Sequence, residues 1–235
     1  MYFDLQTKKF YMMEYIDFIN ALISTCLTKN PPHLFLYESR LLFRRAARRC
    51  LHEKNYVITD IGAELLRTQI HTSKQDLSIF AAGLGGAGED MSSVLQAIYS
   101  VSSLKNDIVV WLPECSAVLM KFMLGLGVNH VLYEDRLYTE LKLFDPTLPF
   151  ISPYFLREKS AAESIRRIKK LSPAELATVL DFSRGLDVHA ISAFRQISDK
   201  TVYTHRKNAM KNLKIESATE WFKLLTFLKG FDFTR

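Results

Sequence analysis

Five polar side chains near the C-terminal end of the chain recur at the spacing of one helix face. They are Lys200, Tyr203, Thr204, Lys207 and Lys211. At 100° per residue these positions share one side of a helix. The opposite side holds Val202, His205, Ala209 and Leu213. Ammonium and hydroxyl groups can donate to phosphates and to base edges. The pattern therefore predicts a helix over 200–213 that packs with one face and contacts duplex DNA with the other.

The positive charge of the chain is concentrated in the same region. Its 235 residues carry a formal net charge of +6, with 31 Lys and Arg against 25 Asp and Glu. Residues 157–235 hold 16 of these cations and 9 of the anions, so the whole positive excess lies in the last third. Clustered cations favour a polyanion, because neutralised phosphates release condensed counterions. An anionic membrane or a partner protein is the competing hypothesis for the basic helix.

A glycine-rich segment, Gly83–Gly88, supports a different hypothesis. It fits the G-x-G-x-x-G pattern and lies between a predicted strand and a predicted helix, which is the setting of a dinucleotide-binding loop. However, it follows the third strand of its domain, and Asp107 begins the next strand where a ribose-binding acid would end one. A flexible loop that tolerates tight turns is therefore favoured. A nucleotide-binding α/β protein that uses this loop remains the alternative.

Catalytic and metal-binding constellations are not evident in the sequence. No nucleophile stands out beside a base, and the six histidines are scattered without metal-ligand spacing. Cys26, Cys50 and Cys115 are far apart and predict apolar packing in a reducing compartment. Neither a cleavable leader nor a stretch of about 20 apolar residues is recognisable. We therefore expect a cytoplasmic protein that is not an enzyme, holds no cofactor or metal and has no membrane partner.

The apolar pattern divides the chain into four parts. The predicted boundaries are 1–30 for a helical extension, 31–144 for an α/β domain, 145–170 for a proline-containing linker and 171–235 for an all-helical domain. Within the α/β domain, short apolar runs alternate five times with amphipathic runs, which favours a parallel sheet with helices on both faces. The predicted strands are 33–37, 56–61, 77–82, 107–112 and 130–133, and the predicted helices are 40–53, 63–72, 90–102, 117–126 and 136–143.

Helix boundaries in the all-helical domain are marked by capping residues. Residues 172–175 can form a capping box with a proline in the first turn, and Gly185 ends that helix. A short helix follows over 187–194, and Ser198 caps the next helix. Two helices joined by a tight turn, the second of them basic, are typical of a helix-turn-helix. A last helix is predicted over 217–228.

The same residues resemble the LuxR/FixJ (GerE-type) helix-turn-helix family. The resemblance rests on Leu171-Ser172-Pro173, Gly185, Ile191, Lys200-Thr201-Val202, Thr204-His205-Arg206, Asn208 and Leu213. The sequence departs from the family pattern at Ala177, where the family has an acidic residue, and at Arg195 and Gln196, where it has leucine and glycine. We expect these changes to loosen the turn and to leave the recognition helix intact. Within the family, the chain resembles auxiliary enterobacterial regulators.

This resemblance implies roles for the residues of the recognition helix. Those that face bases would be Tyr203, Thr204 and Lys207. Those that contact phosphates would be Lys200, Thr201, Arg206 and Lys211. The last helix would be a dimerisation element, which suits a two-fold DNA site. The implied partners are double-stranded DNA and either a second copy of the chain or another response regulator in a heterodimer.

The α/β domain lies where response regulators of this family carry a phosphoacceptor receiver. The runs LYESRLLFRRAA, GVNHVLYED and FISP resemble its first strand and helix, its last strand and the end of its linker. A receiver needs an acidic pair for Mg²⁺, an acceptor aspartate, a Ser or Thr and a lysine. These positions fall here on Glu38-Ser39, Ala81 or Ala82, Leu112-Pro113 and Glu134. The resemblance therefore implies a pseudo-receiver, and we expect a regulator that does not switch by phosphorylation.

Overall fold

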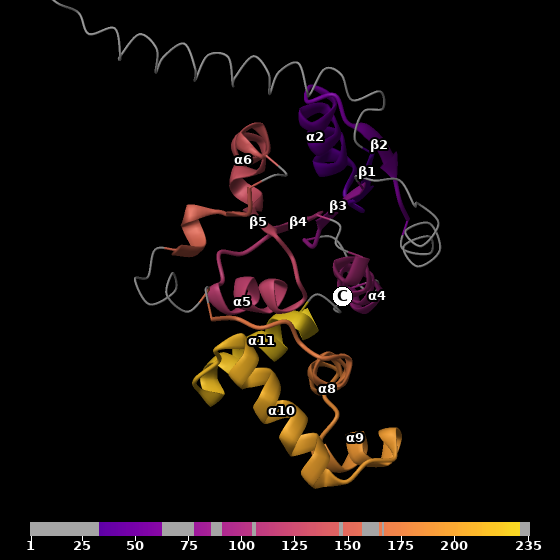
Figure 1. Cartoon of the computed structure of the whole chain (residues 1–235), viewed down its shortest axis with the longest axis vertical. Coiled ribbons are helices and arrows are strands. Elements are labelled where there is room, and N and C mark those ends of the chain that lie inside the picture. The colour runs from indigo at the N-terminus through magenta and orange to yellow at the C-terminus, as the bar shows by residue number, and fades with distance from the viewer. Residues whose placement is uncertain are drawn as a thin grey trace, which may run out of the picture. The chain divides into compact units, whose positions relative to one another are not determined.

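A six-stranded, all-parallel sheet forms the centre of the N-terminal part of the computed structural model (Figure 1). The structure describes residues 33–62, 78–85, 91–104, 107–145, 148–156, 165 and 167–230. The strands lie in the order β2-β1-β3-β4-β5-β6. They are β1 (His33–Tyr37), β2 (Val57–Asp60), β3 (Ser78–Gly83), β4 (Asp107–Leu112), β5 (His130–Tyr133) and β6 (Phe150–Ile151).

Helices cover both faces of this sheet, as predicted for strands that are apolar throughout. On one face lie α2 (Leu41–His52) and α6 (Leu137–Leu143), and on the other lie α4 (Met91–Val101) and α5 (Ala117–Gly125), as Figure 1 shows. Alternate residues of β1 enter the two cores: Leu34 and Leu36 pack on the α2 side, whereas Phe35 packs on the α4 side. Short 3₁₀ turns follow α4, β5 and β6. They are η3 (Ser102–Leu104), η4 (Glu134–Arg136) and η5 (Pro153–Leu156).

The sixth strand is a difference from the prediction of five strand–helix units. Strand β6 lies within residues 145–170, which the sequence predicts as a linker, and its Phe150 and Ile151 pair with His130 and Val131. Ser152 N then donates to Val131 O at 2.8 Å. A two-residue strand between prolines has no periodicity that sequence could reveal. The predicted helices over 1–30 and 63–72 lie outside the described residues.

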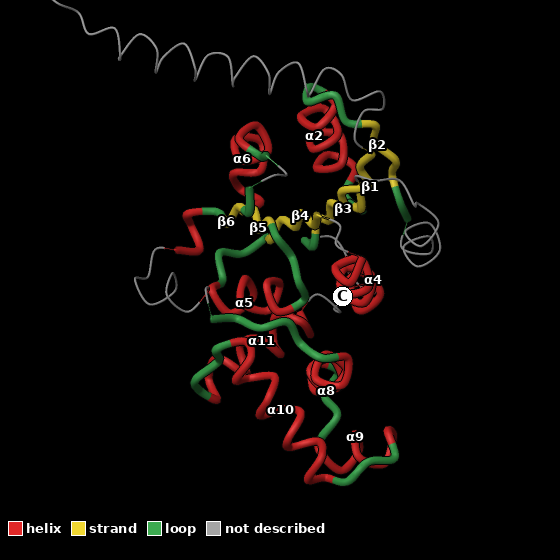
Figure 2. Tube along the Cα trace, in the orientation of Figure 1, coloured by secondary structure: helices red, strands yellow, loops and turns green. Residues whose placement is uncertain are grey.

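The C-terminal part consists of helices and loops over the described residues 167–230, as Figure 2 shows. The helices are α8 (Pro173–Ser183), α9 (Val188–Arg195), α10 (Asp199–Leu213) and α11 (Ala218–Gly230). The bounds of these four helices agree to within a few residues with those predicted from the sequence. The chain therefore combines a parallel α/β region with an all-helical region.

The hydrophobic core of the sheet continues into the C-terminal helices. Residues of α8, α10 and α11 belong to the same buried cluster as those of α4 and α5. A Cβ at Gly125 in α5 would overlap the side chain of Leu213 in α10, so these helices approach as closely as glycine permits. The carbonyl of Gly125 accepts the backbone N–H of Leu171 at 2.8 Å, and Tyr99 donates its hydroxyl to Leu171 O at 2.8 Å.

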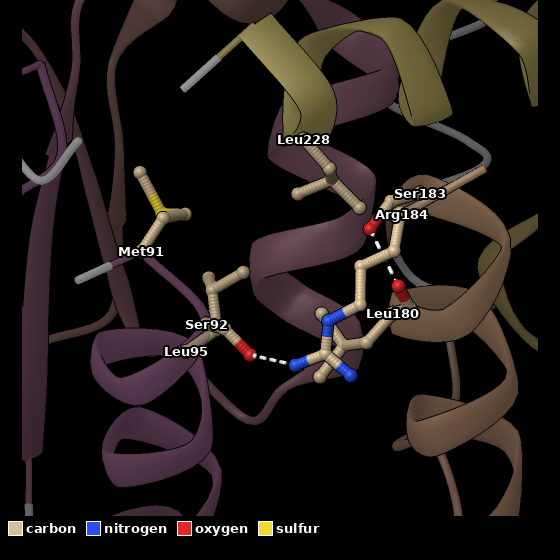
Figure 3. Close-up of a pocket in the computed structure, with 7 residues that line it drawn as sticks. All are labelled: Met91, Ser92, Leu95, Leu180, Ser183, Arg184 and Leu228. Carbon is tan, nitrogen blue, oxygen red and sulfur yellow. Dashed lines mark hydrogen bonds between the residues drawn. The ribbon is translucent and has the colours of Figure 1, made fainter. Parts of the chain in front are cut away.

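Polar side chains add to the contact between the sheet region and the C-terminal helices. Lys121 of α5 is buried and donates to Lys214 O, just after α10, at 2.9 Å and to Glu220 of α11 at 3.3 Å. Figure 3 shows Arg184, at the end of α8, reaching Ser92 of α4, with 2.7 Å between Nη2 and Oγ. Lys121 thus pairs with Glu220 and lies at the C-terminal end of α10, where the helix dipole attracts a cation.

Candidate nucleic-acid interface

Helix α8 begins with the predicted capping box. The Ser172 hydroxyl accepts the N–H of Glu175 at 3.3 Å, and the Glu175 carboxylate accepts the N–H of Ser172 at 2.9 Å. The same carboxylate accepts Nδ2 of Asn212 at 3.1 Å. The Glu175 side chain therefore caps the beginning of α8 and also holds the C-terminal end of α10 against it.

The turn between α9 and α10 contains the two departures from the family pattern. Gln196 ends α9 with a φ of 55°, the left-handed conformation in which glycine is favoured. Arg195 donates from Nε to the carboxylate of Asp181, a side chain of α8 that is fully buried. The ion pair anchors the turn where the family has a leucine. The expected loosening is therefore opposed by one of the two substitutions.

Helix α10 presents the two predicted faces. Its cap is Ser198, whose hydroxyl accepts the N–H of Thr201 at 3.1 Å. Val202, Ala209 and Leu213 are fully buried, whereas His205 is half-buried. The inward face is thus confirmed for the three apolar residues, and His205 lies at its margin.

The opposite face of α10 is open to solvent. Its exposed residues are Lys200, Tyr203, Thr204, Lys207, Asn208 and Lys211. Tyr203 is 56% exposed, which is unusual for so large a ring. A shallow groove of about 450 Å³ runs beside it, lined by Tyr203, Arg206, Lys207, Met210, Lys211 and Ile215. Cations, a phenol and apolar carbons together match the edges and thymine methyl groups of a major groove.

Two of the predicted contact residues are less free than the others. Thr201 is half-buried, and its Oγ1 lies 2.8 Å from Oγ of Ser198. The Arg206 guanidinium lies over the rings of Phe182 and Trp221, at 5.7 and 5.5 Å from their centroids. Sequence analysis could not place Arg206 on these rings, because they come from α8 and α11. The groove is also lined by Met210 and Ile215, which the sequence analysis did not single out.

Helix α11 packs with one side and exposes the other. Trp221, Leu224 and Leu228 are buried in the common core, whereas Phe222 is 62% exposed. The exposed side borders a groove of about 890 Å³ between α11 and the beginning of α5. An exposed phenylalanine beside a groove is typical of a protein–protein contact surface.

The receiver-like positions lie at the carboxyl edge of the sheet, but they do not form an acidic site. Glu38 and Glu134, which follow β1 and β5, are both bonded to Arg40. Ala81 is buried within β3, where it pairs with Leu36 of β1 and Val109 of β4, two residues before the strand ends. The residue of β3 that faces Glu38 is Gly83, where a Cβ would overlap the Glu38 carboxylate.

The described part of the glycine-rich loop has a structural explanation. At Gly85 a Cβ would lie 2.6 Å from both Arg40 Nη1 and Glu134 Oε2. Gly83 and Gly85 are therefore required by close approach to charged side chains, and two carboxylates beside them would repel a pyrophosphate. Residues 86–88 lie outside the described part of the chain.

The described residues contain no group of three or more His, Cys, Asp or Glu side chains that could hold a metal ion. Of the helices that the structure describes, none is both long and apolar enough to cross a membrane. Cys50 is buried, as predicted, whereas Cys115 is exposed and its thiol donates to Tyr154 O at 2.9 Å.

Comparison with known families identifies the helical region. Residues 169–225 match the family described as bacterial regulatory proteins, luxR family. The chain therefore carries a LuxR-type helix-turn-helix domain, the DNA-binding domain of a transcription regulator. No curated protein matches the chain by sequence.

Solved structures that are similar to most of this chain include RcsB and FixJ. The two-component response regulator RcsB in a DNA complex has 17% identity and a TM-score of 0.49, covering 84% of this chain and 98% of that one. RcsB from Salmonella enterica serovar Typhimurium bound to promoter P1flhDC has 18% identity and a TM-score of 0.47, covering 83% and 98%. Full-length FixJ from B. japonicum has 18% identity and a TM-score of 0.37, covering 85% and 97%.

Proposed function

We propose that the chain is a sequence-specific transcription regulator that reads the DNA major groove with α10 and does not depend on phosphorylation. The observation that carries this proposal is the exposed face of α10, a cationic surface inside a LuxR-type helix-turn-helix domain. That face stays open while the helical region is packed on α4 and α5, because α10 uses its other face for packing. The proposal assigns the chain no enzymatic reaction.

The residues of α10 divide into base-reading and phosphate-binding groups. We assign base contacts to Tyr203, Thr204 and Lys207, in the middle of the exposed face. We assign phosphate contacts to Lys200, Thr201, Arg206 and Lys211. For Arg206 this contact requires the guanidinium to reach a phosphate from the rings of Phe182 and Trp221. Cation–π attraction to these rings restrains the guanidinium, so the arrangement favours a fixed contact.

Independence from phosphorylation is proposed from the carboxyl edge of the sheet. An aspartyl phosphate requires a carboxylate at the end of the third strand, and β3 ends in Gly83. Phosphotransfer to the protein from a small phosphodonor would contradict this part of the proposal.

We further propose that the chain binds DNA as a dimer through the exposed side of α11. Phe222 and the neighbouring groove support a protein–protein contact there. The second subunit is either another copy of the chain or a conventional response regulator. Sedimentation of the wild type and Phe222→Glu distinguishes these cases: a homodimer that dissociates in the variant favours the first, and a monomeric wild type favours the second.

The experiment that tests DNA reading begins with genome-wide mapping of the DNA sites that the protein occupies. Binding to a mapped duplex and to a scrambled duplex is then measured for wild type, Lys207→Ala and Arg45→Ala. Arg45 is an exposed arginine of α2 and serves as the matched control. Lys207→Ala should weaken binding to the mapped duplex by roughly 1–3 kcal/mol and Arg45→Ala should not.

Equal weakening on both duplexes would assign Lys207 to phosphate contact alone. Binding to anionic vesicles without binding to duplex DNA would instead favour the membrane alternative. A salt-dependent preference for the mapped duplex is the result that supports the proposal.

A further inference from the structure

Arg40 links two carboxylates at the carboxyl edge of the sheet. Its Nη1 and Nη2 donate to the two oxygens of Glu134, each at 2.6 Å. Its Nε and Nη2 donate to the two oxygens of Glu38 at 3.0 and 2.9 Å. The guanidinium also lies 4.0 Å from the centroid of the Phe43 ring. One cation thus holds the residues that follow β1 and β5 in two bidentate pairs, the strongest form of this interaction.

The Glu38 carboxylate has no capacity left for another partner. Besides the two guanidinium bonds, Oε1 accepts the backbone N–H of Arg40 at 2.9 Å, and Oε2 accepts Nε1 of Trp111 at 2.9 Å. A carboxylate offers about four lone-pair sites, and these four donors use them. The Glu38 side chain is fully buried, and that of Glu134 is 10% exposed. Arg40 therefore balances one of the two negative charges, and donors of the chain occupy the oxygens of Glu38.

These residues do not fit the divalent cation that the receiver resemblance implies. A cation would need free oxygen ligands, and the guanidinium already occupies the space between the two carboxylates. Neither Gly83 nor Gly85 can carry a side chain here, since a Cβ at Gly83 would overlap Glu38 and Trp111, and one at Gly85 would lie 2.6 Å from atoms of Arg40 and Glu134. The glycines and the guanidinium are thus complementary parts of one packed arrangement.

We propose that Arg40 is the resident counter-ion of this edge and takes the place that a divalent cation holds in a switching receiver. The guanidinium is permanently charged and covalently attached, so it holds the ends of β1, β3 and β5 in one arrangement at every metal concentration. This inference rests on the proposed independence from phosphorylation and supplies its physical cause. It also predicts a latent property: without Arg40, Glu38 and Glu134 form an acidic site that accepts a metal ion.

The test uses the full chain and two metal probes. Thermal unfolding is measured with and without millimolar Mg²⁺, and Tb³⁺ luminescence is excited through tryptophan, because Trp111 touches Glu38. The wild type and Arg45→Ala should show no change in Tm with Mg²⁺ and no sensitised luminescence. Arg40→Ala should unfold at a lower temperature than the wild type, gain Tm with Mg²⁺ and show saturable Tb³⁺ luminescence. Arg40→Ala combined with Glu134→Gln should lose most of that metal response.

Two further variants keep the inference falsifiable if Arg40→Ala does not fold. Arg40→Lys retains a cation and should remain indifferent to both metals, and Glu134→Gln alone should also remain indifferent because Arg40 still neutralises Glu38. Metal binding by the wild type would overturn the inference, and so would an Arg40→Ala variant that folds but ignores both metals. DNA binding by the wild type is measured separately in EDTA. Absence of that binding would contradict the proposed function, whereas the metal titrations test only the role of Arg40.

Discussion

The carboxyl edge of the sheet and the outer face of α10 both concentrate charge, but they use it in opposite ways. At the edge, Arg40 is matched by Glu38 and Glu134 within hydrogen-bonding distance. On α10, Lys200, Lys207 and Lys211 are exposed and form no ion pair within the described part of the chain. In the first region each charged side chain has a partner of opposite charge within the chain, whereas the lysines of the second require a partner from outside.

The contrast separates stability from recognition. A buried charge is tolerated only when its partners are in place, so the edge should be sensitive to any substitution that removes one partner. An exposed cation contributes little to folding and much to binding a polyanion. Substitutions at the edge should therefore change unfolding, and substitutions on α10 should change DNA binding.

The largest expected effect is at Glu38. Its replacement by alanine leaves the Trp111 N–H and part of the Arg40 guanidinium without acceptors, and the unfolding free energy should fall by about 3–5 kcal/mol. Urea unfolding followed by fluorescence measures this. Glu53→Ala is the control, because its pair with Arg49 is exposed and should contribute less than about 1 kcal/mol. Similar losses in the two variants would show that burial does not distinguish the pairs.

The second expected effect is a pH dependence of the unfolding free energy that arises in the sheet region and not on α10. His130 of β5 is fully buried, neither ring nitrogen has a hydrogen-bond partner within the described part of the chain, and burial lowers its pKa to about 4 against an opposing effect of Asp145. Because the unfolded chain takes up the proton first, stability should be complete above about pH 6.5 and fall as the pH drops from there to about 4.

This loss should amount to a few kcal/mol and should be absent in His130→Leu. Unfolding free energies at several pH values between 4 and 7.5 measure it for both proteins. If the wild type and the variant have parallel pH profiles, His130 is not the titrating group.

A third effect concerns the phosphate contacts on α10. Lys200→Ala and Lys211→Ala should weaken binding to every duplex alike, and each should reduce the slope of log K against log salt by about 1. Arg45→Ala, at an exposed arginine of α2, is the control. Weakening confined to the mapped site would mean that these lysines contact bases instead.

The smallest effect is expected at the turn before α10. Gln196 has a φ of 55°, where glycine carries no Cβ penalty, so Gln196→Gly should stabilise the protein by about 1 kcal/mol. Gln196→Ala keeps the Cβ and should bring no such gain. The midpoint of urea unfolding distinguishes the two variants, and equal midpoints would mean that the left-handed backbone is not the source of strain.

Local features of the structure could be predicted from the sequence. The capping box of Ser172 and Glu175 and the buried face of α10 depend on residues three to seven positions apart, so their spacing reveals them. The strands β1, β3, β4 and β5 were also predictable, because buried parallel strands are continuous apolar runs.

Features that join distant segments could not be predicted. Arg40 and Glu134 are 94 residues apart, and nothing in either segment indicates the other. The same holds for Lys121 and Glu220, and for Arg206 with the rings of Phe182 and Trp221. The glycine-rich loop illustrates the consequence: its pattern suggested a flexible turn or a nucleotide site, and the reason for Gly83 and Gly85 emerged only with the charged side chains beside them.

The central claim is that α10 reads DNA without phosphorylation, and one titration tests it most directly. The full chain, in EDTA and without a phosphodonor, is titrated onto a mapped duplex and its scrambled counterpart at several salt concentrations. The account predicts tight, salt-dependent binding that prefers the mapped duplex, with the preference reduced in Lys207→Ala. Binding that appears only after treatment with Mg²⁺ and a phosphodonor, or no preference between the duplexes, would contradict it.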